Sequence, residues 1–345
     1  MNHKKLGKQT IFFKQPPTIL ETASIVGPKE GEGPLASYFD KVECDDTCGE
    51  KTFEKAEEYF SYQCVRLLME KSKVKKDEVD YYIGGDLLNQ IISTNATAKK
   101  IQIPFYGIYG ACSTFAEGMH LACYIIAGEF ADHIIISASS HFSSAERQYR
   151  SPLESGVQRK MSAQWTVTGA GSIMLSKGYK APYITHVTTG IVQDYGIKDA
   201  NNMGTAMAPA AVETIIAHFK DTGYKPTDYD LIITGDLGTV GKSIAIDILT
   251  QEGYDVRNRF TDCGVEIFDD TQDTHARGSG AGCSAVVFSG YLYQKLQRNE
   301  INTILFIPTG ALLSPTTSLQ GDSIPTIAHA VTIENYPKLG RKEVH

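Results

Sequence analysis

The stretch "YGIYGACSTFAEG", residues 106–118, places one cysteine, Cys112, between a glycine-containing strand-like segment and a segment typical of a helix. A cysteine at such a strand-to-helix turn lies at a helix N-terminus. Unpaired N–H groups and the helix dipole there lower the pKa of a thiol and can hold an anion. A small cysteine that only fills a crowded turn has the same local pattern. The stretch therefore leaves two interpretations open, a functional thiol and a packing residue.

Two pairs of similar segments indicate that the chain contains two copies of one unit. The segment "DYYIGGDL" (80–87) resembles "DLIITGDL" (230–237). The residues that follow Cys112 resemble those that follow Cys283, because in both a Cys-Ser pair opens a helix-length segment and a β-branched strand comes next. Self-similarity of this kind is typical of a duplicated architecture.

Each copy alternates β-branched, strand-like segments with amphipathic, helix-like ones. This alternation predicts a largely parallel sheet with helices on both faces. Two such sheets that share buried helices would form a five-layer α-β-α-β-α sandwich. The predicted strands are 18–26, 79–86, 132–139, 166–176, 183–192, 230–236 and 304–310. The predicted helices are 51–72, 209–223, 241–253 and the segments that begin at Cys112 and Cys283.

A boundary near Gly178 would divide the chain into an N-terminal half, 1–178, and a C-terminal half, 179–345. The polar segment 142–164 interrupts the first half and is predicted to be an excursion that serves as a lid or as a partner surface. The candidate contact residues on it are basic: Arg147, Arg150, Arg159 and Lys160.

Composition excludes several classes of function. The net charge of −7 argues against non-specific nucleic-acid binding, which needs a basic face. Seven cysteines without a framework spacing favour a reducing compartment. The basic start lacks the apolar stretch of a signal peptide, and no apolar run has the length of a membrane span. We therefore expect a cytoplasmic protein or one peripherally attached to a membrane.

Three short motifs imitate sites that we do not expect. The segment "GDLGTVGKS" (235–243) has five residues between its glycines where a phosphate-binding loop has four. The pair in "CDDTC" (44–48) lacks a second pair of zinc ligands, and "DDTQD" (269–273) lacks the glycine and terminal glutamate of a calcium loop. The sequence predicts neither a metal site nor a cofactor.

The chain resembles the thiolase superfamily, which includes thiolases and β-ketoacyl synthases, and it is most similar there to the stage V sporulation AD family of spore-forming bacteria. This resemblance implies a thiolase-like duplicated sandwich. The stretches that carry it run from residue 27 to 331 and include "GPKEGEGPLASYFD" (27–40), "YGACSTF" (109–115), "SSHFSSAERQYRSP" (139–152), "MGTAMAPAA" (203–211), "GSGAGCSAVVFSG" (278–290) and "TGALLSP" (309–315).

The sequence departs from the catalytic pattern that the resemblance implies. Condensing enzymes of the superfamily combine their cysteine with a histidine and a histidine or asparagine. In such enzymes the two groups lie in two successive loops of the C-terminal half. Here the first of these loops carries Asp236, whose charge would raise the pKa of a neighbouring thiol. His275 lies only near the second, and Thr309 stands where biosynthetic thiolases have another cysteine. We therefore predict a non-catalytic binding pocket derived from a condensing site.

The residues predicted to bind the ligand share one expected place, the carboxyl ends of the strands and the two elbows. They are Cys112, Ser113, His141, Asp236, Cys283, Thr309 and Gly310. The alternative is a thiolase- or β-ketoacyl-synthase-like acyltransferase that uses Cys112 with His141 or His275 in an unusual proton relay.

The resemblance also implies a biological role. The family works in the machinery that moves dipicolinic acid (pyridine-2,6-dicarboxylate), largely with calcium, into the developing spore. It implies membrane proteins of the stage V sporulation A operon as partners, peripheral attachment to the inner spore membrane in the forespore, and a link to spore germination. Thiolase-fold proteins usually pair through the N-terminal half, which implies a homodimer.

Overall fold

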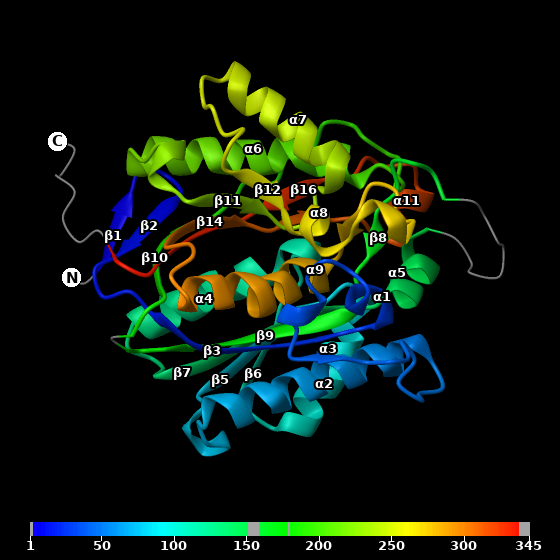
Figure 1. Ribbon diagram of the computed structural model, residues 1–345, viewed down its shortest axis with the longest axis horizontal. Coiled ribbons are helices and arrows are strands. Elements are labelled where there is room, and N and C mark those ends of the chain that lie inside the picture. Colours follow the sequence, from blue (N-terminus) through cyan, green and yellow to red (C-terminus); the bar gives the residue numbers. More distant parts are fainter. Residues whose placement is uncertain (1–2, 151–158, 179, 338–345) are drawn as a thin grey trace.

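The computed structural model describes residues 3–150, 159–178 and 180–337. Figure 1 shows three helical layers separated by two layers of strands. Helices α2 and α3 cover one outer face, α4 and α9 lie in the middle, and α6 and α7 cover the other outer face. The predicted α/β sandwich is therefore confirmed.

The first copy of the unit spans residues 18–176. Its α2 helix begins at a cap where the Thr52 side chain accepts a hydrogen bond from the Lys55 N–H at 3.2 Å, the type of contact that fixes a helix start. Its main elements are β3 (Thr18–Val26), α2 (Phe53–Ser72), β5 (Tyr81–Asp86), α3 (Ile92–Ile101), β6 (Phe105–Gly107), α4 (Thr114–Ala127), β7 (His133–Ser140) and β9 (Gly169–Ser176).

The second copy repeats this order. Helix α6 begins at Met203, six residues before the predicted start at Pro209. The proline favoured a helix start there, but the helix retains it in its interior. The main elements are β10 (Tyr183–Thr188), α6 (Met203–Thr222), β11 (Leu231–Thr234), α7 (Gly238–Gln251), β12 (Phe260–Asp262), α9 (Ala281–Val286), α10 (Tyr293–Gln297), β14 (Thr303–Ile307) and β17 (Ala330–Glu334).

The sheets are mixed, so the prediction of a largely parallel sheet was wrong. The strand order is β6-β5-β7-β9-β3 in one half and β12-β11-β14-β17-β10 in the other, joined where Thr18 pairs with Tyr183. β5 and β11 pair in parallel with both neighbours, but β9 and β17 pair antiparallel with theirs. Strands buried on both faces have the same apolar pattern in either direction, so the sequence does not reveal the reversal.

The N-terminal hairpin of β1 (His3–Leu6) and β2 (Thr10–Phe13) lies against the second half, because β2 pairs antiparallel with β10. The Asp221 carboxylate at the end of α6 accepts the backbone N–H groups of residues 8–10 and the Thr10 hydroxyl. This hairpin crosses the boundary that the sequence suggested near Gly178, and the boundary itself stays a prediction.

Buried aromatic rings hold the middle layer to both halves. Phe115 of α4 lies 6.1 Å from Phe288 and 6.4 Å from Phe306 of β14, between ring centroids. All three side chains are fully buried. Because α4 and the chain after α9 fill the space between the sheets, their N-terminal ends meet at one end of the molecule.

Shorter elements surround that end. They are α1 (Pro28–Gly31), β4 (Lys41–Val42), α5 (Phe142–Tyr149), β8 (Trp165–Thr166), α8 (Cys263–Ile267), β13 (Gly278–Ser279), β15 (Thr309–Ala311), α11 (Pro315–Leu319) and β16 (Thr326–Ala328).

Candidate functional site

Cys112 lies at a tight elbow between β6 and α4. The preceding residue, Ala111, has a φ of 51°, a left-handed conformation that non-glycine residues adopt at a cost. Residues 111–113 form a single 3₁₀ turn, and α4 begins at Thr114. The Cys112 side chain is 6% exposed, so the elbow presents it to an internal space and not to the surface.

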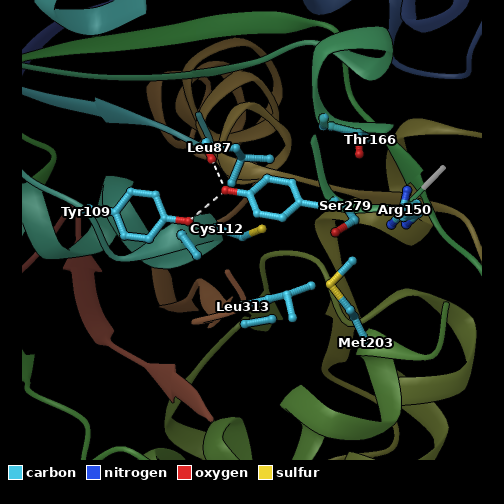
Figure 2. Close-up of a pocket in the computed structure, with 12 residues that line it drawn as sticks. Leu87, Tyr109, Cys112, Arg150, Thr166, Met203, Ser279 and Leu313 are labelled. Atoms are coloured by element: carbon cyan, nitrogen blue, oxygen red, sulfur yellow. Dashed lines mark hydrogen bonds between the residues drawn. The ribbon is translucent and has the colours of Figure 1, made fainter. Parts of the chain in front are cut away.

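That space is a narrow pocket of about 30 Å³ that is partly open to solvent, and Figure 2 shows residues that line it. The walls come from both halves of the chain, which explains why no single segment predicted them. They are largely apolar, with a few polar groups, which is typical of small-molecule sites. The lining residues are Leu87, Tyr109, Ala111, Cys112, Ala145, Tyr149, Arg150, Thr166, Met203, Ser279, Ala311 and Leu313.

Behind Cys112 lies a buried carboxylate, Asp236, at the end of β11. It accepts hydrogen bonds from the Thr309 hydroxyl and, at 3.3 Å, from the Ser279 hydroxyl. The Cys112 thiol is a third hydrogen-bond donor to it. The Gln164 amide donates to the Asp236 backbone carbonyl at 2.5 Å and holds the loop in place. Asp236 thus takes its hydrogen bonds from hydroxyl and thiol groups.

Burial controls the protonation of this cluster. Loss of solvation raises the pKa of the Asp236 carboxyl from 3.8 to about 7, partly opposed by its hydrogen bonds from Thr309 and Cys112. Burial also raises the pKa of the Cys112 thiol well above its usual value, and the neighbouring Asp236 raises it further. Cys112 is therefore a neutral thiol at neutral pH. The helix N-terminus was expected to lower the pKa of the Cys112 thiol, but burial outweighs that effect. The predicted rise caused by Asp236 is present.

Arg150 brings a positive charge into the pocket wall. Its side chain is 6% exposed, and Nη1 donates to the Glu146 carboxylate one helical turn earlier. The Nε N–H is buried and has no hydrogen-bond partner among the residues that the structure describes. Buried polar groups are normally paired, so this free donor suits an acceptor oxygen supplied by a ligand. Figure 2 shows the guanidinium near Ser279 and Met203.

Two hydrogen-bonded tyrosines line the same pocket. The hydroxyls of Tyr109 and Tyr149 lie 3.0 Å apart, and Tyr149 also donates to the Leu87 carbonyl. The pair adds aromatic surface to a wall that also includes Met203 and Leu313. A flat apolar ring that carries an anionic group would find both a ring surface and a cation here.

The predicted ligand-binding residues fall into three groups. Cys112 lines the pocket, and Asp236 and Thr309 lie in the cluster behind it. The others are packed away from the space, and their roles in binding stay predictions. Ser113 Oγ donates to the Gly110 carbonyl at 2.7 Å, a Cβ at Gly310 would lie 2.2 Å from that same oxygen, and Cys283 Sγ donates to the Gly235 carbonyl at 3.3 Å.

The histidines of the predicted proton relay lie elsewhere. His141 caps α5 by accepting the Ser143 N–H, and its Nε2 lies 2.9 Å from the Asp46 carbonyl. His275 lies 2.8 Å from the Lys160 carbonyl and 3.3 Å from the Asp273 carboxylate. Neither lines the pocket beside Cys112. The sequence left open whether His141 faces the pocket or has a capping role, and its side chain caps α5.

The segment 142–164 also differs from its prediction. Residues 142–149 form α5, and 151–158 lie outside the described residues. Arg150 is buried in the pocket wall, and Arg159 lies 4.9 Å from the Trp165 ring and donates to the Gln164 carbonyl at 2.6 Å. Arg150 is therefore too buried to belong to a partner surface, while the assignment of the half-buried Arg159 stays a prediction. Arg147 and Lys160 remain exposed, at 45% and 59%.

Sequence reasoning missed most of the pocket wall. The periodicity of α5 offered one signal, since Ala145 and Tyr149 recur four residues apart and share a helix face. Within the described ranges, no group of three or more His, Cys, Asp or Glu side chains is arranged to hold a metal ion.

Comparison with known proteins decides the family. A family model described as Stage V sporulation protein AD (SpoVAD) matches residues 7–334. Stage V sporulation protein AD of Bacillus subtilis (strain 168) is 43% identical over 331 residues, which covers 96% of this chain and 98% of that protein. This chain belongs to the SpoVAD family. It is thus a member of a family of sporulation proteins.

Solved structures similar to this SpoVAD family member are thiolase-like enzymes. The 3-oxoacyl-(acyl-carrier-protein) synthase III of Aquifex aeolicus has a TM-score of 0.57 and 13% identity, with 92% of this chain and 99% of that chain covered. A variant of Xanthomonas campestris OleA has a TM-score of 0.59 and 11% identity, with 93% and 98% covered. At this identity the likeness shows the fold alone. In the described part of the chain, no helix combines the length and apolar character of a membrane span.

Proposed function

We propose that this SpoVAD family member is a non-catalytic binding component for dipicolinic acid in the spore transport machinery, and that the ligand occupies the pocket beside Cys112. The observation that carries the proposal is Arg150, a buried guanidinium with a free Nε N–H in an otherwise largely apolar pocket. Dipicolinate is a flat aromatic ring with two carboxylates. The tyrosine pair suits its ring, and Arg150 suits one carboxylate.

Polar groups elsewhere in the wall suit the second carboxylate. Thr166 and Ser279 carry hydroxyls, and both residues line the same pocket. The protein carries a net charge of −7, so its overall field does not attract a dianion. A one-to-one calcium complex of dipicolinate is neutral, and binding of that complex would avoid the repulsion.

Binding is tested by calorimetry with dipicolinate and with its calcium complex at matched ionic strength. Replacement of Arg150 by glutamine removes the charge and should weaken dipicolinate binding about tenfold or more, because a buried charge-assisted contact contributes about 1.5–3 kcal/mol. Arg147→Gln is the matched control, since Arg147 lies on the same helix and is exposed. Equal affinity of the two variants would contradict the proposed pose.

The proposed absence of catalysis rests on the protonation state of the Cys112 thiol. Thiolates attack acyl groups and neutral thiols do so poorly, and both burial and Asp236 keep this sulfur protonated. Incubation with acyl-coenzyme A followed by intact-mass spectrometry separates this proposal from the acyltransferase alternative. A thioester on Cys112 that forms and turns over would establish the alternative.

Partners and location rest on family resemblance. We propose contact with the membrane proteins of the stage V sporulation A operon, peripheral attachment to the inner spore membrane, and a homodimer. The exposed Arg147 and Lys160 remain candidates for the partner surface. Charge reversal at Lys160 should release the protein from the spore membrane fraction without a change in ligand affinity. Retention in that fraction would remove this surface from consideration.

A further inference from the structure

The positive charge of Arg150, which faces the pocket, is partly balanced by the neighbouring Glu146 carboxylate. Glu146 and Arg150 lie one turn apart at the end of α5, and their side chains are 9% and 6% exposed. Because water is nearly excluded, the Glu146 carboxylate cancels much of the field of Arg150 on its own side. The Nε edge of the guanidinium remains without a partner among the described residues.

A second guanidinium lies close enough to matter. Burial and then the positive charge of Arg150 lower the pKa of Arg159, while Glu146 and Asp273 oppose this. Arg159 is fixed by its hydrogen bond to the Gln164 carbonyl and by the Trp165 ring. Arg150 and Glu146 together thus carry no net charge, and Arg159, which does not line the pocket, adds one positive charge to the group.

We propose that Glu146 is the charge-selecting residue of the pocket: its carboxylate occupies one edge of Arg150, as a ligand carboxylate would, and thereby limits the affinity for anions. This inference rests on the proposed function and adds the residue that tunes it. A transport component must release what it binds, and an internal carboxylate that partly satisfies the arginine makes release faster. Without Glu146, the Arg150 guanidinium would face an anionic ligand without a competing carboxylate.

The test compares Glu146→Gln with the wild type at low ionic strength. The variant should bind dipicolinate about tenfold more tightly, since removal of a nearby like charge in a poorly solvated site changes binding by at least about 1.4 kcal/mol. Binding of the neutral pyridine-2,6-dicarboxamide should not change. A merely structural role of Glu146 would alter both ligands alike, so the ratio of the two affinities is the decisive readout.

Two further variants complete the design. The gain should disappear in the double variant Glu146→Gln/Arg150→Gln, because it acts through the guanidinium. Glu54→Gln is the matched control: it removes the ion pair of Glu54 on α2 with Arg147 on α5, and neither residue lines the pocket. Thermal unfolding confirms that each variant folds.

The outcomes separate this inference from the proposed function. Unchanged or weaker binding of anions to Glu146→Gln overturns the charge-selecting role, even where dipicolinate binds the wild type. If dipicolinate binds neither protein, inorganic sulfate serves as a second dianion. Tighter sulfate binding by the variant then supports the role of Glu146 and removes only the proposed ligand, and no difference with sulfate overturns the inference.

Discussion

Replacement of Asp236 by asparagine should flatten the dependence of stability on pH. The folded-state pKa of this carboxyl is about 7, and its ordinary value is 3.8. The native state therefore binds the proton more tightly than the unfolded chain, and the stabilisation is fully present below about pH 4 and is lost as pH rises towards 7. At about 1.4 kcal/mol per pKa unit, the full loss is about 4 kcal/mol above pH 7.

The assay is urea unfolding from pH 4.5 to 8.5 at constant ionic strength. Trp165 is the only tryptophan and stacks on Phe142 at 3.6 Å between ring centroids, so its fluorescence reports on packing at this end of the molecule. Far-UV circular dichroism checks that the transition is global. The free energy of unfolding of Asp236→Asn minus that of the wild type should rise by about 1.4 kcal/mol per pH unit up to about pH 6.5.

A control variant shows that the assay detects such a group. Burial also raises the pKa of Glu30 to about 7, and Glu30 does not line the pocket. The free energy of unfolding of Glu30→Gln minus that of the wild type should therefore also rise with pH. The ligand affinity of this variant should be unchanged. In Asp236→Asn, the N–H groups of the new amide shift the unfolding free energy by an amount that does not vary with pH. If the curves of Asp236→Asn and the wild type run parallel, the reasoning about this carboxyl is refuted.

Three further predictions concern other parts of the structure. Iodoacetamide should label the exposed Cys44 well before Cys112 in the native protein, as peptide mass spectrometry would reveal; equal rates would contradict a buried neutral thiol. Gly310→Ala should lower the unfolding free energy by about 2 kcal/mol or more, measured in urea, because its Cβ would lie 2.2 Å from the Gly110 carbonyl oxygen. Asp221→Ala should lower the unfolding free energy by about 2–3 kcal/mol, since the N-terminal hairpin loses its half-buried acceptor, and an unchanged midpoint would show that the hairpin is held by strand pairing alone.

The sequence predicted the elements of the fold better than their directions. The predicted strand 18–26 is β3, residue for residue, because its β-branched run is bounded by prolines. The repeat correctly related the two elbows at Cys112 and Cys283. It could not reveal that β9 and β17 reverse direction, since the direction of a doubly buried strand depends on the connection before it.

The site was predictable at its sulfur, at its carboxylate and at Thr309, which donates to that carboxylate. Cys112 and Asp236 both follow strands of the repeated unit, so chain position alone brings them together. Arg150 and Tyr109 contribute through side-chain direction and through contact between segments far apart in the chain. His141 shows the same limit, because its strand ends where predicted but the ring turns to cap α5.

The N-terminal hairpin makes the folding of the N-terminal residues depend on the C-terminal half. Residues 8–12 have their strand partner in β10 and their carboxylate partner at Asp221, and Asp221 lies more than two hundred positions later in the chain. They must wait for most of the chain to emerge before they can dock, and such distant closure is slow. An isolated N-terminal fragment that ends near Gly178 would therefore carry an orphaned strand, open to mispairing with other copies.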